Sequence, residues 1–178
     1  MRRIPEGMAV MLAALIAVTG CGSPTLVRLK QQAELPGYRE ARPTIPVQAE
    51  DAMRLYIYRP QSMVGMWGSA VVIVNGAWLG DRENPLIDNK LIPGAVFIVD
   101  VPAAPARVWS YQSGRGEDRE TALQLVPAQS RTWFLRWTLK PTYGYLTTVD
   151  EREASAELES LRFSGYVKLD NPPALPAR

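Results

Sequence analysis

Short apolar segments separated by turn-forming residues dominate the chain and limit the folds that it can adopt. In the longest segment, residues 132–140, bulky apolar side chains occupy every second position. A period of two places alternate side chains on opposite faces of a β-strand. Further short apolar segments occur at 53–59, 70–74, 95–102, 106–112 and 121–126. So many short strands predict a mainly β fold, either an Ig-like β-sandwich or a small barrel.

Smaller features predict how these strands are buried and connected. Residues 70–74 and 95–102 are apolar on both faces, which is typical of central strands. The dipeptide Asn75-Gly76 follows the first of them and predicts a type I′ hairpin turn. Trp133 and Trp137 share a strand face with leucines, so we expect both indoles to lie in the core.

The hydrophobic period changes to that of a helix once, between residues 148 and 162. Asp150, followed three positions later by Glu153, forms a capping-box pattern. The apolar stripe behind it consists of Ala154, Leu158 and Leu161. We expect one amphipathic helix, at about 151–162, packed with this stripe on the outer face of the strands. Residues 163–169 are predicted to add an edge strand.

The start of the chain has the features of a targeting segment. Arg2 and Arg3 precede an unbroken apolar run at 8–18, and Val18-Thr19-Gly20 places small residues before Cys21, which is the single cysteine. In helical form the run would cover roughly 16 Å, about half of a bilayer core, so it is too short to span a membrane. The pattern resembles the lipobox of bacterial lipoproteins. The resemblance implies removal of residues 1–20 and a lipid on Cys21.

The rest of the chain divides into a linker, a domain and a tail. Residues 21–51 are rich in proline and charged residues, which predicts a flexible linker. The domain is expected at 52–170, and the proline-rich residues 171–178 are expected to be a disordered tail. Several acyl chains on Cys21 would hold the protein on a membrane permanently. Gly22 follows the lipidated cysteine, which by resemblance to a known sorting pattern favours the outer membrane, facing the periplasm.

Several segments together resemble a domain-of-unknown-function family of small bacterial envelope lipoproteins. The resemblance covers about residues 53–162 and consists of an L-Y-x-Y-R-P strand, a V-x-V-N/D-G-x-x-x-G hairpin and an acidic C-terminal helix. The matching residues are Leu55, Tyr56, Tyr58, Arg59, Pro60, Gly65, Asn75, Gly76 and Gly80. At 101–105 the chain has V-P-A-A-P where the family usually has V-P-P-G, which affects a turn. The resemblance implies a β-sandwich in the cell envelope and assigns no activity.

Composition excludes several classes of chemistry. The chain contains no histidine, which rules out Ser-His-Asp and Cys-His catalysis and histidine-containing zinc sites. The single cysteine rules out disulfides within the chain and thiolate metal centres. A formal net charge of +2 lacks the basic surplus of nucleic-acid-binding proteins. We therefore expect no enzyme activity, no cofactor, no metal and no nucleic-acid partner.

Carboxylates are the remaining catalytic groups, and three of them fall within one loop, at Asp81, Glu83 and Asp88. Such a loop could bind calcium or supply a glycosidase-like pair. However, the spacing fits neither motif, and Pro85 interrupts it. The favoured interpretation is a solvated loop between strands that is a candidate for partner contact.

Two further residues are candidates for a binding surface. Arg59, beside Tyr56 and Tyr58, could recognise a carboxylate or a glycan, although pairing at the end of its strand is the favoured interpretation. Trp67 lies in the glycine-bounded loop 65–68, where no strand period requires it to point inward.

The sequence thus favours a membrane-anchored, non-catalytic β-sandwich module that binds another envelope protein, the cell wall or a membrane surface through its loops. Two alternatives stay open: a hydrolase or lyase that uses only carboxylates, arginine and tyrosine, and a carrier of apolar ligands. The carrier predicts an enclosed apolar cavity between the helix and the sheet. The oligomeric state is not determined by these patterns.

Overall fold

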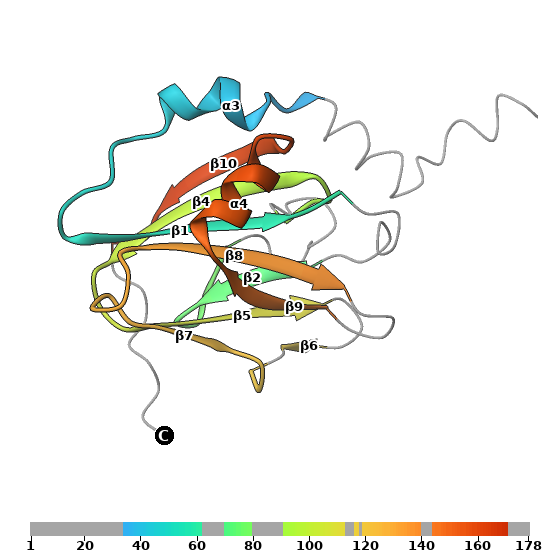
Figure 1. Ribbon diagram of the computed structural model, residues 1–178. Coiled ribbons are helices and arrows are strands. Elements are labelled where there is room, and N and C mark those ends of the chain that lie inside the picture. The colour runs from blue at the N-terminus through green and yellow to red at the C-terminus, as the bar shows by residue number, and fades with distance from the viewer. Residues whose placement is uncertain are drawn as a thin grey trace, which may run out of the picture.

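The computed structural model describes residues 34–61, 70–79, 91–112, 116–117, 119–139 and 144–170, which form two packed β-sheets (Figure 1). Sheet 1 has the strand order β10 (Arg162–Lys168), β4 (Ala95–Pro102), β1 (Ala52–Arg59), β8 (Thr132–Leu139) and β9 (Gly144–Val149). Sheet 2 has the order β3 (Ala77–Trp78), β2 (Ala70–Val74), β5 (Ala106–Gln112) and β6 (Gly116–Glu117), and β7 (Leu123–Leu125) also pairs with β5. The predicted β-sandwich is confirmed.

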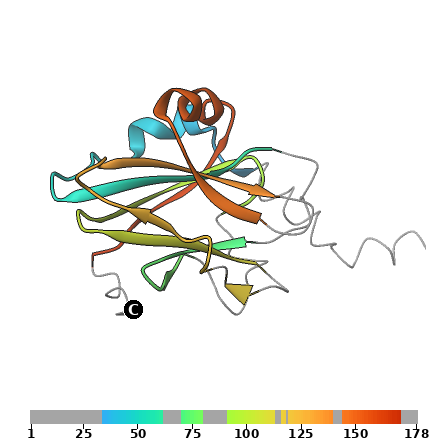
Figure 2. The ribbon, with the colours of Figure 1, turned by 60° about the horizontal axis from the view of Figure 1, so that its bottom comes forward.

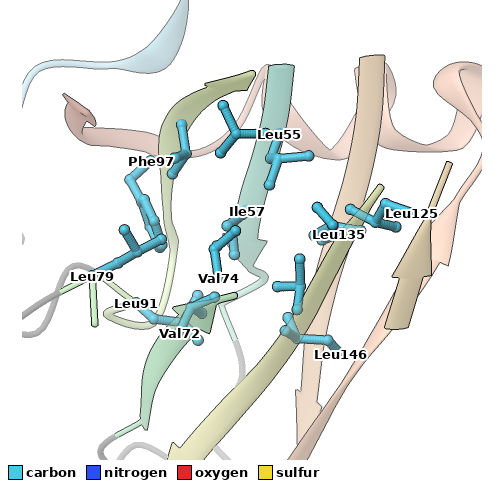
Figure 3. Close-up of a cluster of buried hydrophobic side chains, with 14 of the residues drawn as sticks. Leu55, Ile57, Val72, Val74, Leu79, Leu91, Phe97, Leu125, Leu135 and Leu146 are labelled. Atoms are coloured by element: carbon cyan, nitrogen blue, oxygen red, sulfur yellow. The ribbon is translucent and has the colours of Figure 1, made fainter. Parts of the chain in front are cut away.

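The core lies between the two sheets and follows the predicted alternation. Leu55 and Ile57 of β1 point into it and are fully buried, as are Leu135 and Trp137 of β8. Figure 3 shows the aliphatic side chains of the two sheets meeting in this layer. The predicted core position of Trp137 is therefore confirmed, and Trp133 packs against the same cluster while remaining partly exposed.

The predicted hairpin turn is also present. Asn75 and Gly76 have φ values of 51° and 90°, the left-handed conformation that a type I′ turn requires at both positions. The Asn75 side chain adds a further contact, because its Oδ1 accepts a hydrogen bond of 2.7 Å from the backbone N–H of Arg107. This bond ties the turn to the neighbouring strand β5.

The outer face of sheet 1 carries the helix. The helix α4 (Glu151–Leu158) is capped by Asp150, whose Oδ1 accepts a 2.9 Å hydrogen bond from the backbone N–H of Glu153. Its predicted apolar stripe is buried against the sheet. The members of this outer cluster are Tyr38, Tyr58, Val96, Ile98, Phe134, Ala154, Leu158 and Leu161. The predicted packing is confirmed, and Figure 2 shows α4 lying on the same side of the sandwich as α3 (Tyr38–Ala41).

The helix ends earlier than the expected limit near residue 162. Its last helical residue is Leu158, because Arg162 already pairs with β4 through a backbone bond to the Gly94 carbonyl. The predicted edge strand is confirmed as β10, which lies at the end of sheet 1 and runs parallel to β4. Within the described residues, no helix combines the length and apolarity needed to cross a membrane.

The domain begins earlier than predicted. Residues 34–51, expected to be linker, include α3 and the 3-10 helix η1 (Arg42–Thr44), and Tyr38 and Ala41 are buried. The backbone N–H of Tyr38 bonds to the Leu161 carbonyl at 2.8 Å. This half of the expected linker is therefore part of the folded unit. The remainder of the linker, the signal segment 1–20 and the tail 171–178 lie outside the described residues.

Candidate functional site

One end of the sandwich collects the loops in which the sequence places its candidate binding residues. Strands β1, β5 and β8 finish there, and β2, β4 and β9 start there. The pairs that fix this arrangement are Arg59↔Ala95, Ala70↔Gln112 and Leu139↔Gly144. The arrowheads of β1 and β8 mark this end in Figure 1. We call it the loop end, because the connections 60–69 and 140–143 join strands at it and the connection 79–94 arrives at it where β4 begins.

The structure places Arg59 beneath the loop end. Arg59 is only 4% exposed, and its guanidinium carbon lies 4.3 Å from the ring centroid of Trp137. Burial follows from position, because Arg59 continues the inward-facing set of β1 after Leu55 and Ile57. Arg59 is thus a buried group, stacked on a core indole, and not a side chain presented at the surface. A desolvated cation on an indole face gains about 2 kcal/mol or more.

The other candidate residues cannot be placed beside it. Trp67, Asp81, Glu83 and Asp88 lie outside the described residues, as does the lipidation candidate Cys21. What the structure does bring together is the set of strand ends from which their loops leave. The connections that contain these four residues thus reach the strand ends at which Arg59 lies.

The core beneath the loop end is polar, unlike the aliphatic layer in its centre. The Nε2 of Gln112 donates a 2.6 Å hydrogen bond to the Gly144 carbonyl and thereby links sheet 2 to sheet 1. The Trp137 Nε1 and the Ser110 Oγ are buried and have no hydrogen-bond partner among the described residues. Sequence reasoning missed Ser110 and Gln112. The sequence signal for them was their polarity. Alternate residues of β5 point into the core, and the other inward residues of this strand are apolar.

Charged groups on the outer face of sheet 1 have structural partners. The guanidinium of Arg54 donates two hydrogen bonds of 2.7 Å to the two carboxylate oxygens of Asp100, and a third, also of 2.7 Å, to the Pro46 carbonyl. The Tyr166 hydroxyl donates to the same carboxylate at 3.0 Å. The Asp100 hydrogen bonds raise the pKa of Arg54 above its usual value despite burial, so this cation stays charged.

A second polar network joins α4 to the sheet. The Tyr58 hydroxyl donates a 2.5 Å hydrogen bond to Glu157, and Arg136 bridges Glu157 and Glu153 at 3.0 and 2.6 Å. Burial, followed by the hydrogen bond to Glu157, raises the pKa of Tyr58 well above that of free tyrosine. Tyr58 therefore stays protonated, and these carboxylates hold the helix in place.

A surface pocket of about 380 Å³ lies at the opposite end of the sandwich, where β8 begins, β9 ends and α4 starts. Its walls include Trp133, Phe134 and Val149, and its acidic residues are Asp150 and Glu151. No sequence pattern indicates this pocket, because its residues come together only where β8 and β9 diverge.

Within the part of the chain that the structure describes, no group of three or more His, Cys, Asp or Glu side chains could hold a metal ion. Comparison of the chain with family models, curated proteins and solved structures finds no match.

Proposed function

We propose that the chain is a lipid-anchored protein of the bacterial cell envelope whose β-sandwich is a non-catalytic module that binds a partner through its loop end. The observation that carries the anchor is the sequence Val18-Thr19-Gly20-Cys21 after a short apolar run. The partner belongs to the envelope: another protein or the cell wall. By the resemblance at Gly22, the membrane is the outer one and the domain faces the periplasm.

The role of the loop end is supported by topology. A rigid sandwich commonly presents binding residues on loops that leave one of its ends. Here the connection that contains Trp67 joins two strands at the loop end, and the connection that contains Asp81 to Asp88 arrives there at the start of β4. A buried arginine stacked on an indole lies at the same end of β1. The stack of Arg59 on Trp137 holds the end of β1, from which the connection to β2 continues.

The non-catalytic assignment is supported by what the charged groups do. Acid-base catalysis needs a carboxylate or another titratable group that is free to exchange a proton with a substrate. Asp100 accepts hydrogen bonds from Arg54 and Tyr166, and Glu157 accepts them from Tyr58 and Arg136. These carboxylates serve the packing of the sheet and the helix. The hydrolase alternative was based on the carboxylates at 81–88, which lie outside the described residues.

The apolar-carrier alternative gains no support from the helix side of the sheet. The space between α4 and sheet 1, where such a carrier would hold its ligand, contains the packed side chains of Phe134, Ala154 and Leu158. Each of them is at most 8% exposed.

The proposal is tested by two substitutions in the full chain expressed in a bacterial host. Cys21→Ser should move the protein from the membrane fraction to the soluble fraction and abolish labelling with a radioactive fatty acid, because the acyl chains can no longer be attached. Trp67→Ala should keep the melting temperature and the membrane fraction unchanged while reducing in-cell crosslinking to its partner.

A control for the second variant is Val47→Ala, which shortens an exposed apolar side chain away from the loop end and should leave crosslinking unchanged. Retention and labelling of the Cys21→Ser protein would disprove the anchor. Crosslinking that survives both Trp67→Ala and neutralisation of Asp81, Glu83 and Asp88 would disprove the loop end as the binding surface.

A further inference from the structure

The pocket at the end opposite the loops arises from the way two paired strands separate. Pairing between β8 and β9 stops at Phe134↔Val149, although β8 begins two residues earlier, at Thr132. After Val149 the chain turns through Asp150 into α4. The separation leaves the pocket of about 380 Å³, bounded by strand residues on one side and the first turn of the helix on the other.

Local hydrogen bonds hold the walls of this pocket in place. The Trp133 Nε1 donates to the Ser130 carbonyl at 2.9 Å, which fixes the indole. The Ser130 hydroxyl accepts from the Thr132 N–H at 3.1 Å and donates to the Thr132 carbonyl at 2.5 Å, which satisfies the strand edge. Asp150 is held by its hydrogen bond to the helix. A ligand would therefore meet a largely preformed site, which lowers the entropic cost of binding.

The charge of the pocket is negative. Asp150 and Glu151 line it, and no lysine or arginine does. Among the described residues, no ion pair reaches either carboxylate, and the basic residue on the adjacent strand, Arg136, is bound to Glu153 and Glu157. The N-terminus of a helix contributes only about half a positive charge. Two carboxylates outweigh it, and the neighbouring Arg131 and Arg152 are not among the lining residues, so the pocket favours a cation.

We infer that this pocket binds the arginine or lysine side chain of a partner polypeptide. Trp133, Phe134 and Val149 offer apolar surface for the methylene stem, and Asp150 and Glu151 can receive the charged head. The volume is at the low end of the range of roughly 300 to 1,000 Å³ for ligand pockets, which suits a single side chain.

The exposure of the carboxylates favours a polypeptide over a free small cation. Asp150 and Glu151 are both exposed, so a free amine or guanidinium would keep much of its hydration and gain little from them. A polypeptide adds contacts with the rim of the pocket. This site lies at the other end of the sandwich from the loops, so the inference does not depend on the proposed function of the loop end.

The test uses the detergent-solubilised full chain, labelled with ¹⁵N, and three probes. They are a five-residue acetylated peptide with a central arginine, the same peptide with neutral citrulline, and free argininamide. The arginine peptide should shift the indole N–H of Trp133 and the backbone N–H of Glu151. Citrulline has almost the same shape without the charge, so it should shift neither. Equal shifts by the citrulline peptide would disprove the role of charge in binding. If argininamide binds as tightly as the arginine peptide, the inference that the ligand is a polypeptide is wrong.

Two variants separate charge from structure. Asp150→Asn removes the charge but keeps a good N-cap residue, and Glu151→Gln removes the second charge. Each should weaken binding of the arginine peptide by about two- to fivefold, the range for an exposed ion pair. The matched control is Glu159→Gln, at the other end of the same helix, which should leave binding unchanged. A control variant that weakens binding as much as Glu151→Gln would show general attraction to an acidic helix and would disprove the pocket.

Discussion

At the scale of single residues, the junction of the two sheets depends on a glycine next to a tryptophan. A Cβ built on Gly144 would collide with the ring of Trp137 and would lie 2.8 Å from the Nε2 of Gln112. The same Gln112 atom bonds to the Gly144 carbonyl, so the glycine lets three strands approach closely. The alternation of residues 132–140 correctly predicted the burial of Trp137. It could not predict Gly144, because the contact is between segments and leaves no periodic signal.

Gly144→Ala should therefore lower the free energy of unfolding by about 1 to 3 kcal/mol, the usual cost of overpacking, or more, because the obstacle is a rigid ring. Urea unfolding followed by tryptophan fluorescence measures it. Gly37→Ala is the matched control, since its added Cβ would have only an ordinary contact, 3.6 Å from Glu40. The control should change stability by about 1 kcal/mol or less. Equal unfolding midpoints for the two variants would contradict the packing of Gly144 on Trp137.

The Arg54 and Asp100 pair is a second feature of this scale. The two residues stand directly opposite each other on β1 and β4 and are 7% and 3% exposed. Removing one partner of a buried pair typically costs about 3 to 5 kcal/mol, because the other charge stays buried. A shift in the register of β1 against β4 would also separate the two charges and leave them buried without each other. The pair therefore helps to fix the register of β1 against β4 while the apolar faces supply the driving force.

At the scale of elements, the hydrophobic period of the sequence predicted the long strands and the helix. Elements of only a few residues are too short to show such a period. The strands with long alternating or continuous apolar runs, and the helix α4 with its stripe, were predicted where they occur. Strand β9 was missed because Gly144 to Val149 buries only Gly144 and Leu146, which is too few for a visible alternation. Helix α3 was missed because it has four residues and lies among prolines. Such short elements are stabilised by the sheet that they pack on, which the local sequence does not encode.

The packing of α4 can be tested by Leu158→Ala. Leu158 is 2% exposed and belongs to the outer cluster with Phe134 and Ile98. Its truncation should lower the free energy of unfolding by about 2 to 4 kcal/mol, as for other buried leucines. Chemical denaturation provides the measurement, with Glu159→Ala as an exposed neighbour that should change little. A loss below 1 kcal/mol would mean that the helix contributes little to the stability of the domain.

At the scale of the whole molecule, the early start of the domain changes how it would sit on a membrane. The segment 36–48 crosses the outer face of sheet 1 and is fixed at both of its ends. The Phe163 N–H bonds to the Pro36 carbonyl at 2.9 Å, and the Gln48 side chain bonds to the Arg131 carbonyl at 2.9 Å. The chain between a lipid on Cys21 and Pro36 would then reach at most about 50 Å when fully extended. The expected 30-residue linker would have reached about twice as far.

Sequence patterns could not predict which segments of the site meet in the whole molecule. Trp67, Asp81, Glu83 and Asp88 were predicted to lie in loops, and the two connections that contain them both reach the loop end. That meeting depends on strand order, which no local pattern determines. The opposite pocket was missed for the same reason, because Trp133 and Asp150 come together only when β8, β9 and α4 are assembled.

Two truncations of the chain test whether residues 34–51 belong to the domain. A chain that begins at Glu34 should unfold at the same urea concentration as one that begins at Gly22, because it keeps every described contact. A chain that begins at Ala52 loses the buried side chains of Tyr38 and Ala41 and the Pro46 carbonyl that accepts from Arg54. A lost hydrogen bond to a buried charge alone costs about 1.5 to 3 kcal/mol, so the total loss should be at least about 3 kcal/mol.

The intermediate variant Tyr38→Ala, made in the chain that begins at Glu34, should account for much of that loss. It removes a buried aromatic ring that meets Tyr56 edge-on at 6.5 Å while leaving the Pro46 contact to Arg54 in place. Truncation of a large buried aromatic costs about 3 to 5 kcal/mol when the site is fully enclosed, and less where one wall is a short surface helix. If the chains that begin at Glu34 and Ala52 unfold at the same midpoint, the segment does not stabilise the sandwich. The domain would then start at β1, and the longer reach of the tether would be restored.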